Sequence, residues 1–298
     1  MFEPRERVTG IIEFTEEKLP YIKVFVYSPS TNITSDIQGV LDTGTFPNQL
    51  HPALISTFFA SSKNRTLVFS FNGGKSGYAN EVRSLPKSSG VNNFLISKGI
   101  YAVFSPQQLF PSTDAYMIMD FANGQFAEAY GSPEDVKKSM DKSFNLHAKS
   151  LGQTFSSSIV KTLELANKDF HGAHIIVKAK FNGVKKETLI DTGSVKTIFS
   201  HKGVQPDKKE ALHINFASQR LKTIGTKSFK VQLGDTVFDN VIARVGGKGF
   251  QNASFGDLKS GKKVSSILGA AFFKDHRTVL AIPFWAKKRP IIIGQYHK

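Results

Sequence analysis

Short segments of the chain alternate apolar and polar residues, which is the pattern of β-strands that bury one face. Tyr21 to Tyr27 alternates in part and is rich in aromatic and β-branched residues. The polar segment Ser28 to Asp36 predicts a loop, and Ile37 to Leu41 predicts a second strand. The first half of the chain therefore starts with two strands joined by a loop.

The second half repeats this order in shorter form. Ala173 to Phe181 predicts a strand, Asn182-Gly183 is a hairpin-turn signal, and Glu187 to Ile190 predicts the returning strand. Few side chains match between the halves, but the order of strand, turn and strand is the same. The pattern therefore indicates an internal duplication at the level of structure.

Two further hairpins are predicted, one in each half. Each has two strand-like segments on either side of a glycine-containing turn, which is a strong hairpin signal. They are Leu67–Phe71 with Tyr78–Val82 around Asn72-Gly73-Gly74, and Phe229–Leu233 with Val237–Ile242 around Gly234-Asp235. With these hairpins, strands account for most of the regular structure that the pattern predicts.

One helix interrupts the strands. Ser132 is a suitable N-cap, Pro133 suits the first helical position, and the helix is predicted over Val136 to Lys149. This polar, lysine-rich stretch is the natural connector between two lobes. We therefore expect an all-β protein with few short helices. Its predicted parts are an N-terminal lobe at residues 1–131, a connector at 132–158 and a C-terminal lobe at 159–298.

The composition fits a globular protein of two domains. A chain of 298 residues with 40% apolar residues, including 26 Phe, can fill two cores. There is no Cys, which excludes disulfides and thiolate metal sites. Residues 1–10 lack the hydrophobic core of a signal peptide. Either the protein stays inside the cell or its leader is absent from this numbering, and we favour a periplasmic or secreted protein.

The charge is distributed unevenly. The formal net charge is +15, and it falls entirely in residues 151–298, because residues 1–150 hold equal numbers of acidic and basic residues. A basic lobe can attract an anionic surface or acidic substrates, so an anionic surface is a candidate partner. The lysines are scattered, however, which favours a solubilising surface. Their short clusters lack interleaved aromatic residues, so we expect no nucleic-acid binding.

The tripeptide Asp-Thr-Gly occurs twice, once in each half. The copies are Asp42-Thr43-Gly44 and Asp191-Thr192-Gly193, which lie 149 positions apart. Each copy follows two aliphatic residues and precedes a small hydroxyl residue, Thr45 in the first and Ser194 in the second. A single copy would be an ordinary turn composition. Two copies with matching flanks predict a pair of carboxyl groups brought together by pseudo-symmetry.

Such a pair carries a specific chemistry. Two carboxyl groups within hydrogen-bonding range cannot both ionise, so they share one proton and their pKa values separate. The ionised group can take a proton from water while the protonated group gives one to a carbonyl oxygen. The pair could therefore hydrolyse a peptide bond without a metal or a nucleophilic side chain. The glycines suit a tight turn close to the opposite lobe, and the hydroxyl groups can orient the carboxylates or hold the two loops together.

These residues resemble the motifs of the pepsin-like and retropepsin-like aspartic peptidases in their single-chain, bilobal form. The resemblance covers Val40 to Thr45 and Leu189 to Ser194, and it extends to Ile267-Leu268-Gly269 and Phe272-Phe273. Thr278 to Pro283 is similar to the strand that follows in that family. The absence of Cys is more similar to a bacterial relative than to secreted eukaryotic pepsins. The resemblance implies two pseudo-symmetric lobes of the acid-protease β-barrel type.

The resemblance also implies roles for the residues of the two triplets. Asp42 and Asp191 would form the catalytic dyad. The other residues would support the catalytic loops: Thr43 and Thr192 by interlocking them, Thr45 and Ser194 by hydrogen-bonding the outer carboxylate oxygens, and Gly44 and Gly193 by allowing the tight turns.

Two features of the first lobe are also placed by the resemblance. The hairpin at residues 72–81 lies where the family carries a flap over the substrate, and Tyr78 is the flap candidate. The aliphatic-aliphatic-glycine element of this lobe falls near Ile100 to Pro106, with Phe104 at the position expected for glycine. An alternative register around Gly99-Ile100 stays open.

We therefore predict a monomeric aspartic endopeptidase that binds an extended polypeptide between its lobes and needs no cofactor or metal. The alternative is a catalytically weak or inactive binding module of the same fold, which would hold a polypeptide or an anionic polymer. The two intact aspartates favour the enzyme, and the altered first-lobe element favours the module. Most of the eight His are expected to be ordinary. His171 and His174 are close in sequence but lack acidic neighbours that would complete a zinc site.

Overall fold

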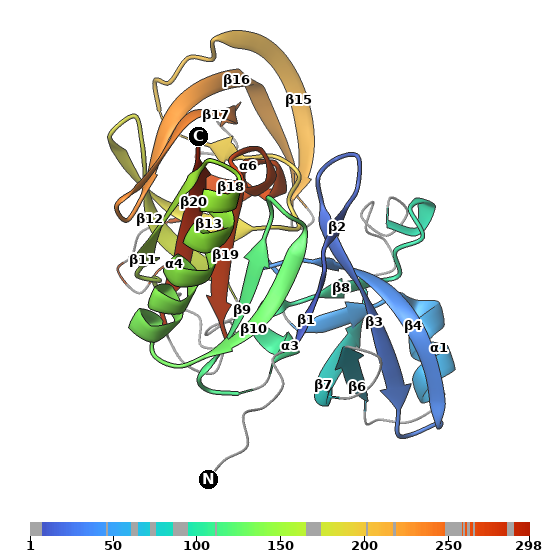
Figure 1. Cartoon of the computed structure of the whole chain (residues 1–298). Helices are drawn as coiled ribbons and strands as arrows, with labels where there is room; N and C mark the ends of the chain where they lie inside the picture. Colours follow the sequence, from blue (N-terminus) through green and yellow to red (C-terminus); the bar gives the residue numbers. More distant parts are fainter. Residues whose placement is uncertain are drawn as a thin grey trace.

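The computed structural model describes most of the chain. It covers residues 8–298 apart from 46, 61–64, 72–75, 86–94, 111, 165–173, 201, 217–218, 248–257, 259, 261–262, 265 and 285–288. Strands predominate in these residues. Three sheets contain them, one in each lobe and one between the lobes. In Figure 1, the blue and teal strands of the first half gather on one side, and the yellow and orange strands of the second half on the other.

The sheet of the first lobe closes into a barrel. Its strand order is β2-β3-β4-β8-β5-β7-β6, and a further pairing between β3 and β6 joins the ends, so that six strands form the barrel and β2 lies outside. The bounds are β2 Glu13–Phe14, β3 Pro20–Ser28, β4 Ile33–Leu41, β5 Asn48–Leu50, β6 Thr66–Phe71, β7 Ser76–Ser84 and β8 Ala102–Phe104. Helix α1, Pro52–Phe59, follows β5, and the short α3, Pro106–Leu109, follows β8.

The second lobe repeats this barrel strand for strand. Its order is β12-β13-β18-β14-β17-β16-β15, and a pairing between β12 and β16 closes six strands and leaves β15 outside. The bounds are β12 Ile175–Phe181, β13 Val184–Asp191, β14 Ile198–Phe199, β15 Lys208–Phe216, β16 Gln219–Leu233, β17 Thr236–Gly246 and β18 Ser266–Gly269. Helix α6, Ala270–Asp275, follows β18 as α3 follows β8. The all-β, two-lobed prediction is confirmed.

Parallel pairings in each barrel fix where the two triplets lie. β4 runs parallel to β8, and β13 runs parallel to β18, so the strand before each triplet is hydrogen-bonded to a strand from much later in the same lobe. Leu41 pairs with Phe104, and Ile190 pairs with Leu268. All four of these side chains are buried in the large apolar core. Burial on the barrel side therefore holds the end of each strand in a set register.

A six-stranded sheet joins the lobes, in the order β1-β10-β9-β19-β20-β11. Its central pair, β9 and β19, is antiparallel and comes from the two halves of the chain, as the green and red strands of Figure 1 show. The bounds are β1 Thr9–Ile11, β9 Ala115–Asp120, β10 Gln125–Tyr130, β11 Thr154–Val160, β19 Thr278–Pro283 and β20 Ile291–His297. The two lobes thus share one hydrogen-bonded sheet, which limits their movement relative to each other.

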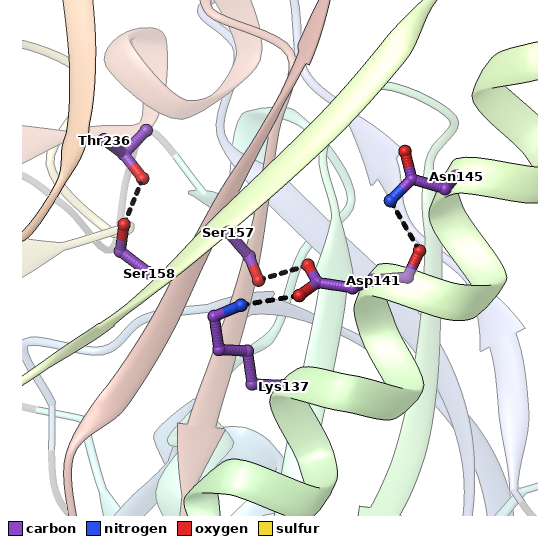
Figure 2. Close-up of polar contacts among 6 residues, drawn as sticks. All are labelled: Lys137, Asp141, Asn145, Ser157, Ser158 and Thr236. Carbon is purple, nitrogen blue, oxygen red and sulfur yellow. Dashed lines mark hydrogen bonds and ion pairs between the residues drawn. The ribbon is translucent and has the colours of Figure 1, made fainter.

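The connector between the lobes is a helix followed by a strand of this sheet. Helix α4, Pro133–Ser150, begins at the expected N-cap Ser132, which forms a capping box with Asp135. On its next turns, Asp141 accepts from Lys137 at 2.6 Å and from the Ser157 hydroxyl of β11 at 2.6 Å (Figure 2). Ser158 is 2.8 Å from Thr236 at the start of β17. None of the described helices is both long and apolar enough to cross a membrane.

The predicted elements agree with the structure in most places, with two boundary corrections. The segment Ser28 to Asp36 is not all loop, because β4 already begins at Ile33. Its first residues pair with β3 while their side chains face solvent, so a polar composition concealed a strand. β13 is longer than predicted for the same reason. The turn predicted at Asn72-Gly73-Gly74 lies outside the described residues.

Candidate active site

The two aspartates lie at equivalent ends of the two barrels. Asp42 directly follows β4, and its N–H donates to the Phe104 carbonyl of β8 at 2.9 Å. Asp191 is the last residue of β13, where it pairs with Gly269 of β18. Pairing with the parallel strands β8 and β18 therefore sets the position of each aspartate along its barrel. Asp191 is 7% exposed, and Asp42 is partly buried.

The threonines of the triplets join the two loops by four reciprocal hydrogen bonds. The Thr43 hydroxyl donates to the Ile190 carbonyl at 2.7 Å and accepts from the Thr192 N–H at 3.1 Å. The Thr192 hydroxyl donates to the Leu41 carbonyl at 2.6 Å and accepts from the Thr43 N–H at 3.1 Å. Both side chains are fully buried. Each hydroxyl thus satisfies two buried backbone groups, both of them on the opposite lobe.

The glycines leave room for the opposite carboxyl group. A Cβ at Gly44 would lie 2.8 Å from the carboxyl carbon of Asp191, and a Cβ at Gly193 would lie 2.3 Å from that of Asp42. Both values are shorter than van der Waals contact. The backbone of each loop therefore lies directly against the aspartate of the other lobe, as the close-approach role of glycine requires.

The two carboxyl groups share a hydrogen bond, and the pKa of each is raised above the ordinary aspartate value. Burial raises the pKa of Asp42 above its usual value, although the hydrogen bond from Asp191 partly offsets this. The pKa of Asp191 is raised well above its usual value, first by burial and then by the adjacent charge and hydrogen bond of Asp42. The pair therefore favours one proton that is shared between the two carboxyl groups.

Backbone N–H groups hold the two carboxylates in place. Gly44 donates to Asp42 Oδ1 at 2.7 Å, and Gly193 donates to Asp191 Oδ1 at 3.1 Å. The Ser194 N–H also donates to Asp191 Oδ1, at 3.0 Å. These donors favour the ionised forms and oppose the effect of burial on both pKa values.

The hydroxyl groups of the next residues bond elsewhere, which differs from the role that the resemblance implied. The Thr45 hydroxyl accepts from Gln49 at 3.1 Å, and the Ser194 hydroxyl donates to the Lys196 carbonyl at 3.1 Å. At Ser194 it is the backbone N–H that reaches the carboxylate. Thr45 and Ser194 therefore shape the loops without a hydroxyl contact to the aspartates.

Comparisons with known proteins identify the architecture. No protein-family model and no curated protein sequence matches the chain. Among solved structures, the aspartic proteinase from Irpex lacteus matches with a TM-score of 0.50 and 11% identity, over 97% of this chain and 97% of that one. The chain has the bilobal aspartic-proteinase fold. A retropepsin-like aspartic protease from Rickettsia conorii also matches, with a TM-score of 0.30 and 18% identity, over 49% of this chain and 96% of that one.

Within the bilobal aspartic-proteinase fold, the first-lobe counterpart of Ile267-Leu268-Gly269 differs from the predicted one. The pairings place Phe104 opposite Leu41, as Leu268 is placed opposite Ile190, so Ser105 is the counterpart of Gly269. Phe104 does not replace the glycine. Its ring lies where a Cβ at Gly39 would be, only 2.3 Å away, so Gly39 makes room for the larger side chain.

The support beneath each loop follows the same plan in both lobes. The Ser105 N–H donates to the Asn48 side chain at 2.7 Å, and the Gly269 N–H donates to the Thr197 hydroxyl at 3.2 Å. Asn48 and Thr197 each lie six positions after their aspartate. In the first lobe, Gln107 also donates to the Thr43 carbonyl at 2.9 Å. Side-chain amides thus support the first loop, although its glycine is missing.

Tyr78, the flap candidate, contacts the six-stranded sheet. The Tyr78 hydroxyl donates at 2.8 Å to Glu128, which belongs to β10 in the six-stranded sheet and is 1% exposed. The Tyr78 ring packs edge-to-face on Phe110 with centroids 5.6 Å apart. Burial and these bonds raise its pKa. The β6–β7 hairpin is therefore a wall of the barrel, equivalent to the β16–β17 hairpin.

The second lobe carries an extension that sequence analysis missed. β16 is 15 residues long where its counterpart β6 has 6, and its added length pairs with β15. We call this two-stranded extension, residues 208–226, the arm; its tip at 217–218 lies outside the described residues. In the first lobe, only residues 60–65 separate α1 from β6, which is too short for a similar arm. The alternation in Lys208–Phe216 was its sequence signal.

The base of the arm lies close to the second catalytic loop. The Arg244 N–H donates to the Thr197 carbonyl at 2.9 Å, and its guanidinium, on a side chain that is 9% exposed, bonds Glu210 at 3.1 Å. On the arm, Ile214 and Leu221 pack with Ile198 and Ile267. Ile267 lies on β18 beside β13, the strand that ends at Asp191, and Ile198 pairs with Ile267 from β14. In the described residues, no group of three or more acidic or histidine side chains could hold a metal ion.

The reciprocal threonine bonds predict a large loss of stability in Thr43→Val. This change keeps the shape but leaves the Ile190 carbonyl and the Thr192 N–H without their buried partner. We expect the free energy of unfolding, measured in urea, to fall by about 1–3 kcal/mol or more. Thr57→Val is the control, because the Thr57 hydroxyl bonds only within the exposed face of α1. An equal effect of the two changes would contradict the interlocked loops.

The raised pKa of Asp191 predicts that Asp191→Asn stabilises the fold at neutral pH. The wild type must either keep a proton or bury a second charge as the pH rises above the ordinary value of 3.8. Its stability therefore falls from that pH up to the folded pKa, whereas asparagine does not titrate. The unfolding free energy of the variant minus that of the wild type should grow over this range in urea titrations. A difference that stays flat over this range would contradict the burial argument.

Proposed function

We propose that the chain is an aspartic endopeptidase, in which Asp42 and Asp191 activate one water molecule for attack on a peptide bond. The observation that carries the proposal is the hydrogen-bonded pair of buried carboxyl groups, each held against the glycine of the opposite loop. The bilobal aspartic-proteinase fold supports it. An inactive binding module would not require this arrangement, in which one proton is shared between two buried acids.

The proposed reaction uses both members of the pair. The ionised carboxylate takes a proton from water, and the oxygen of this water attacks the peptide carbonyl carbon. The protonated carboxyl gives its proton to the carbonyl oxygen, which forms a neutral tetrahedral diol. When the C–N bond breaks, the amine nitrogen receives the proton that the first carboxyl took from water. One diol hydroxyl gives its proton to the second carboxyl as the carbonyl re-forms, so one water is consumed and the pair returns to its starting state. The threonine bonds and backbone donors keep both acids in position throughout.

The substrate that we propose is a polypeptide in an extended conformation. An extended chain presents its carbonyl to the aspartates and its backbone to neighbouring strand-like segments. The arm is the best-placed segment of this kind, because its inner face rests on the apolar residues beside Asp191. On this face, Leu212 is next to Ile214 in the two-residue period of a strand, and it is 42% exposed. We propose that Leu212 contacts an apolar substrate side chain.

Loss of activity in both aspartate variants tests the dyad. With an unfolded protein as substrate, Asp42→Asn and Asp191→Asn should each lower kcat/KM by about 10²-fold to 10⁴-fold or more, since each removes an acid–base step. The wild-type rate should follow a bell-shaped pH profile set by the pair. Exposed Asp239→Asn should keep the wild-type rate. Activity that survives in either dyad variant would refute the assignment, and an inactive wild type would favour the binding module.

A charge on the inner face of the arm tests its role. Leu212→Asp should raise KM several-fold for an unfolded protein substrate and leave the unfolding free energy almost unchanged, because the side chain is already exposed. Val237→Asp is the matched control, since Val237 is 39% exposed and lies on β17 away from the arm. Equal kinetics in the two variants would show that the arm does not contact the substrate.

A further inference from the structure

The two barrels are related residue by residue, but the pseudo-symmetry fails beside the aspartates. Tyr21 pairs with Val40, and Ile176 pairs with Leu189, two residues before each aspartate. Counting back two positions from Tyr21 and Ile176, Leu19 in the first lobe corresponds to His174 in the second. Leu19 is 4% exposed and apolar. One lobe therefore supplies a hydrocarbon at this position, and the other supplies a group that can carry charge.

His174 crosses from the second lobe to the first catalytic loop. Its imidazole hydrogen-bonds the backbone of Gly44 in the sense that favours the protonated ring, so the ring donates. It also acts electrostatically on Asp42, which is two residues away from Gly44 in the first triplet. Gly44 itself lies against Asp191. The histidine thus contacts the loop that lies against both carboxyl groups.

We propose that His174 is a positioning residue of the dyad, which fixes the Gly44 loop from the opposite lobe and biases the shared proton away from Asp42 and toward Asp191. The inference rests on the proposed function, because it assumes that the dyad is catalytic. An imidazolium next to Asp42 stabilises the ionised form of this aspartate. In the otherwise symmetric pair, the histidine distinguishes the base from the acid.

The charged groups around this site are few. In the described residues, the charges that act on the pKa values of His174 and of the dyad are those of Asp42, Asp191 and His174 themselves. Farther along the same strands, Lys178 of β12 stands opposite Glu187 of β13. Burial lowers the pKa of His174, whereas Asp42 and the Gly44 bond raise it. The ring therefore gains its proton on the acidic side of its ordinary pKa, and the imidazolium then favours the ionised form of Asp42.

The pH profile separates this role from simple packing. The imidazolium keeps Asp42 ionised to lower pH, so its removal should move the acidic limb of kcat/KM to higher pH in both His174→Gln and His174→Leu. We expect a loss of about threefold to tenfold on that limb. Near neutral pH, the glutamine variant should keep most of its activity because it can still donate to Gly44, whereas the leucine variant should lose more. Exposed His147→Gln is the control.

Direct titration of the ring tests the contact without any assay of activity. By NMR, the imidazole pKa of His174 should fall in Asp42→Asn, because the carboxylate that favours the imidazolium is gone. An unchanged imidazole pKa, or an acidic limb that stays in place in both His174 variants, would overturn the proposal. An inactive wild type whose imidazole still responds to Asp42→Asn would refute the proposed function and leave the coupling between His174 and Asp42 intact.

Discussion

The structure depends on burying two backbone loops against each other without leaving their polar groups unpaired. Two strands from different lobes end at one point, and each brings N–H and carbonyl groups into a region that water does not reach. The hydroxyls of Thr43 and Thr192 pair with four of these groups. Any side chain at Gly44 or Gly193 would force the loops apart. The proximity of the two acids follows from this arrangement.

Burial then sets the chemistry. Two carboxyl groups removed from water and placed in contact favour one proton between them, whereas backbone donors from Gly44, Gly193 and Ser194 keep ionisation accessible. The six-stranded sheet, to which both halves of the chain contribute strands, holds the lobes together. Differences between the lobes then act on a nearly symmetric centre. The arm and His174 belong to the second lobe only, so the two sides of the site differ although the two catalytic loops are duplicated.

The sequence predicted the features that local pattern determines. Turn residues and alternation predicted the hairpins and the capped helix, and the repeated triplet predicted the pair of carboxyl groups. The sequence could not predict which side chains meet across the barrels. Tyr78 was assigned by its place in a hairpin, but its partner Glu128 is 50 positions away. Phe104 was aligned with the glycine position because the register between β4 and β8 is set by strand pairing, which the sequence does not show. The contact between His174 and the Gly44 loop likewise exists only after both lobes have formed.

The most direct measurement of the central claim is a carbon-13 NMR titration of the aspartate side chains. The account predicts that the resonances of Asp42 and Asp191 titrate together in two steps, and that one proton is retained well above the ordinary aspartate range. In Asp42→Asn, the titration of Asp191 should move to lower pH, because the neighbouring charge no longer opposes its ionisation. Two independent titrations near the ordinary value of 3.8 would contradict a buried pair that shares one proton.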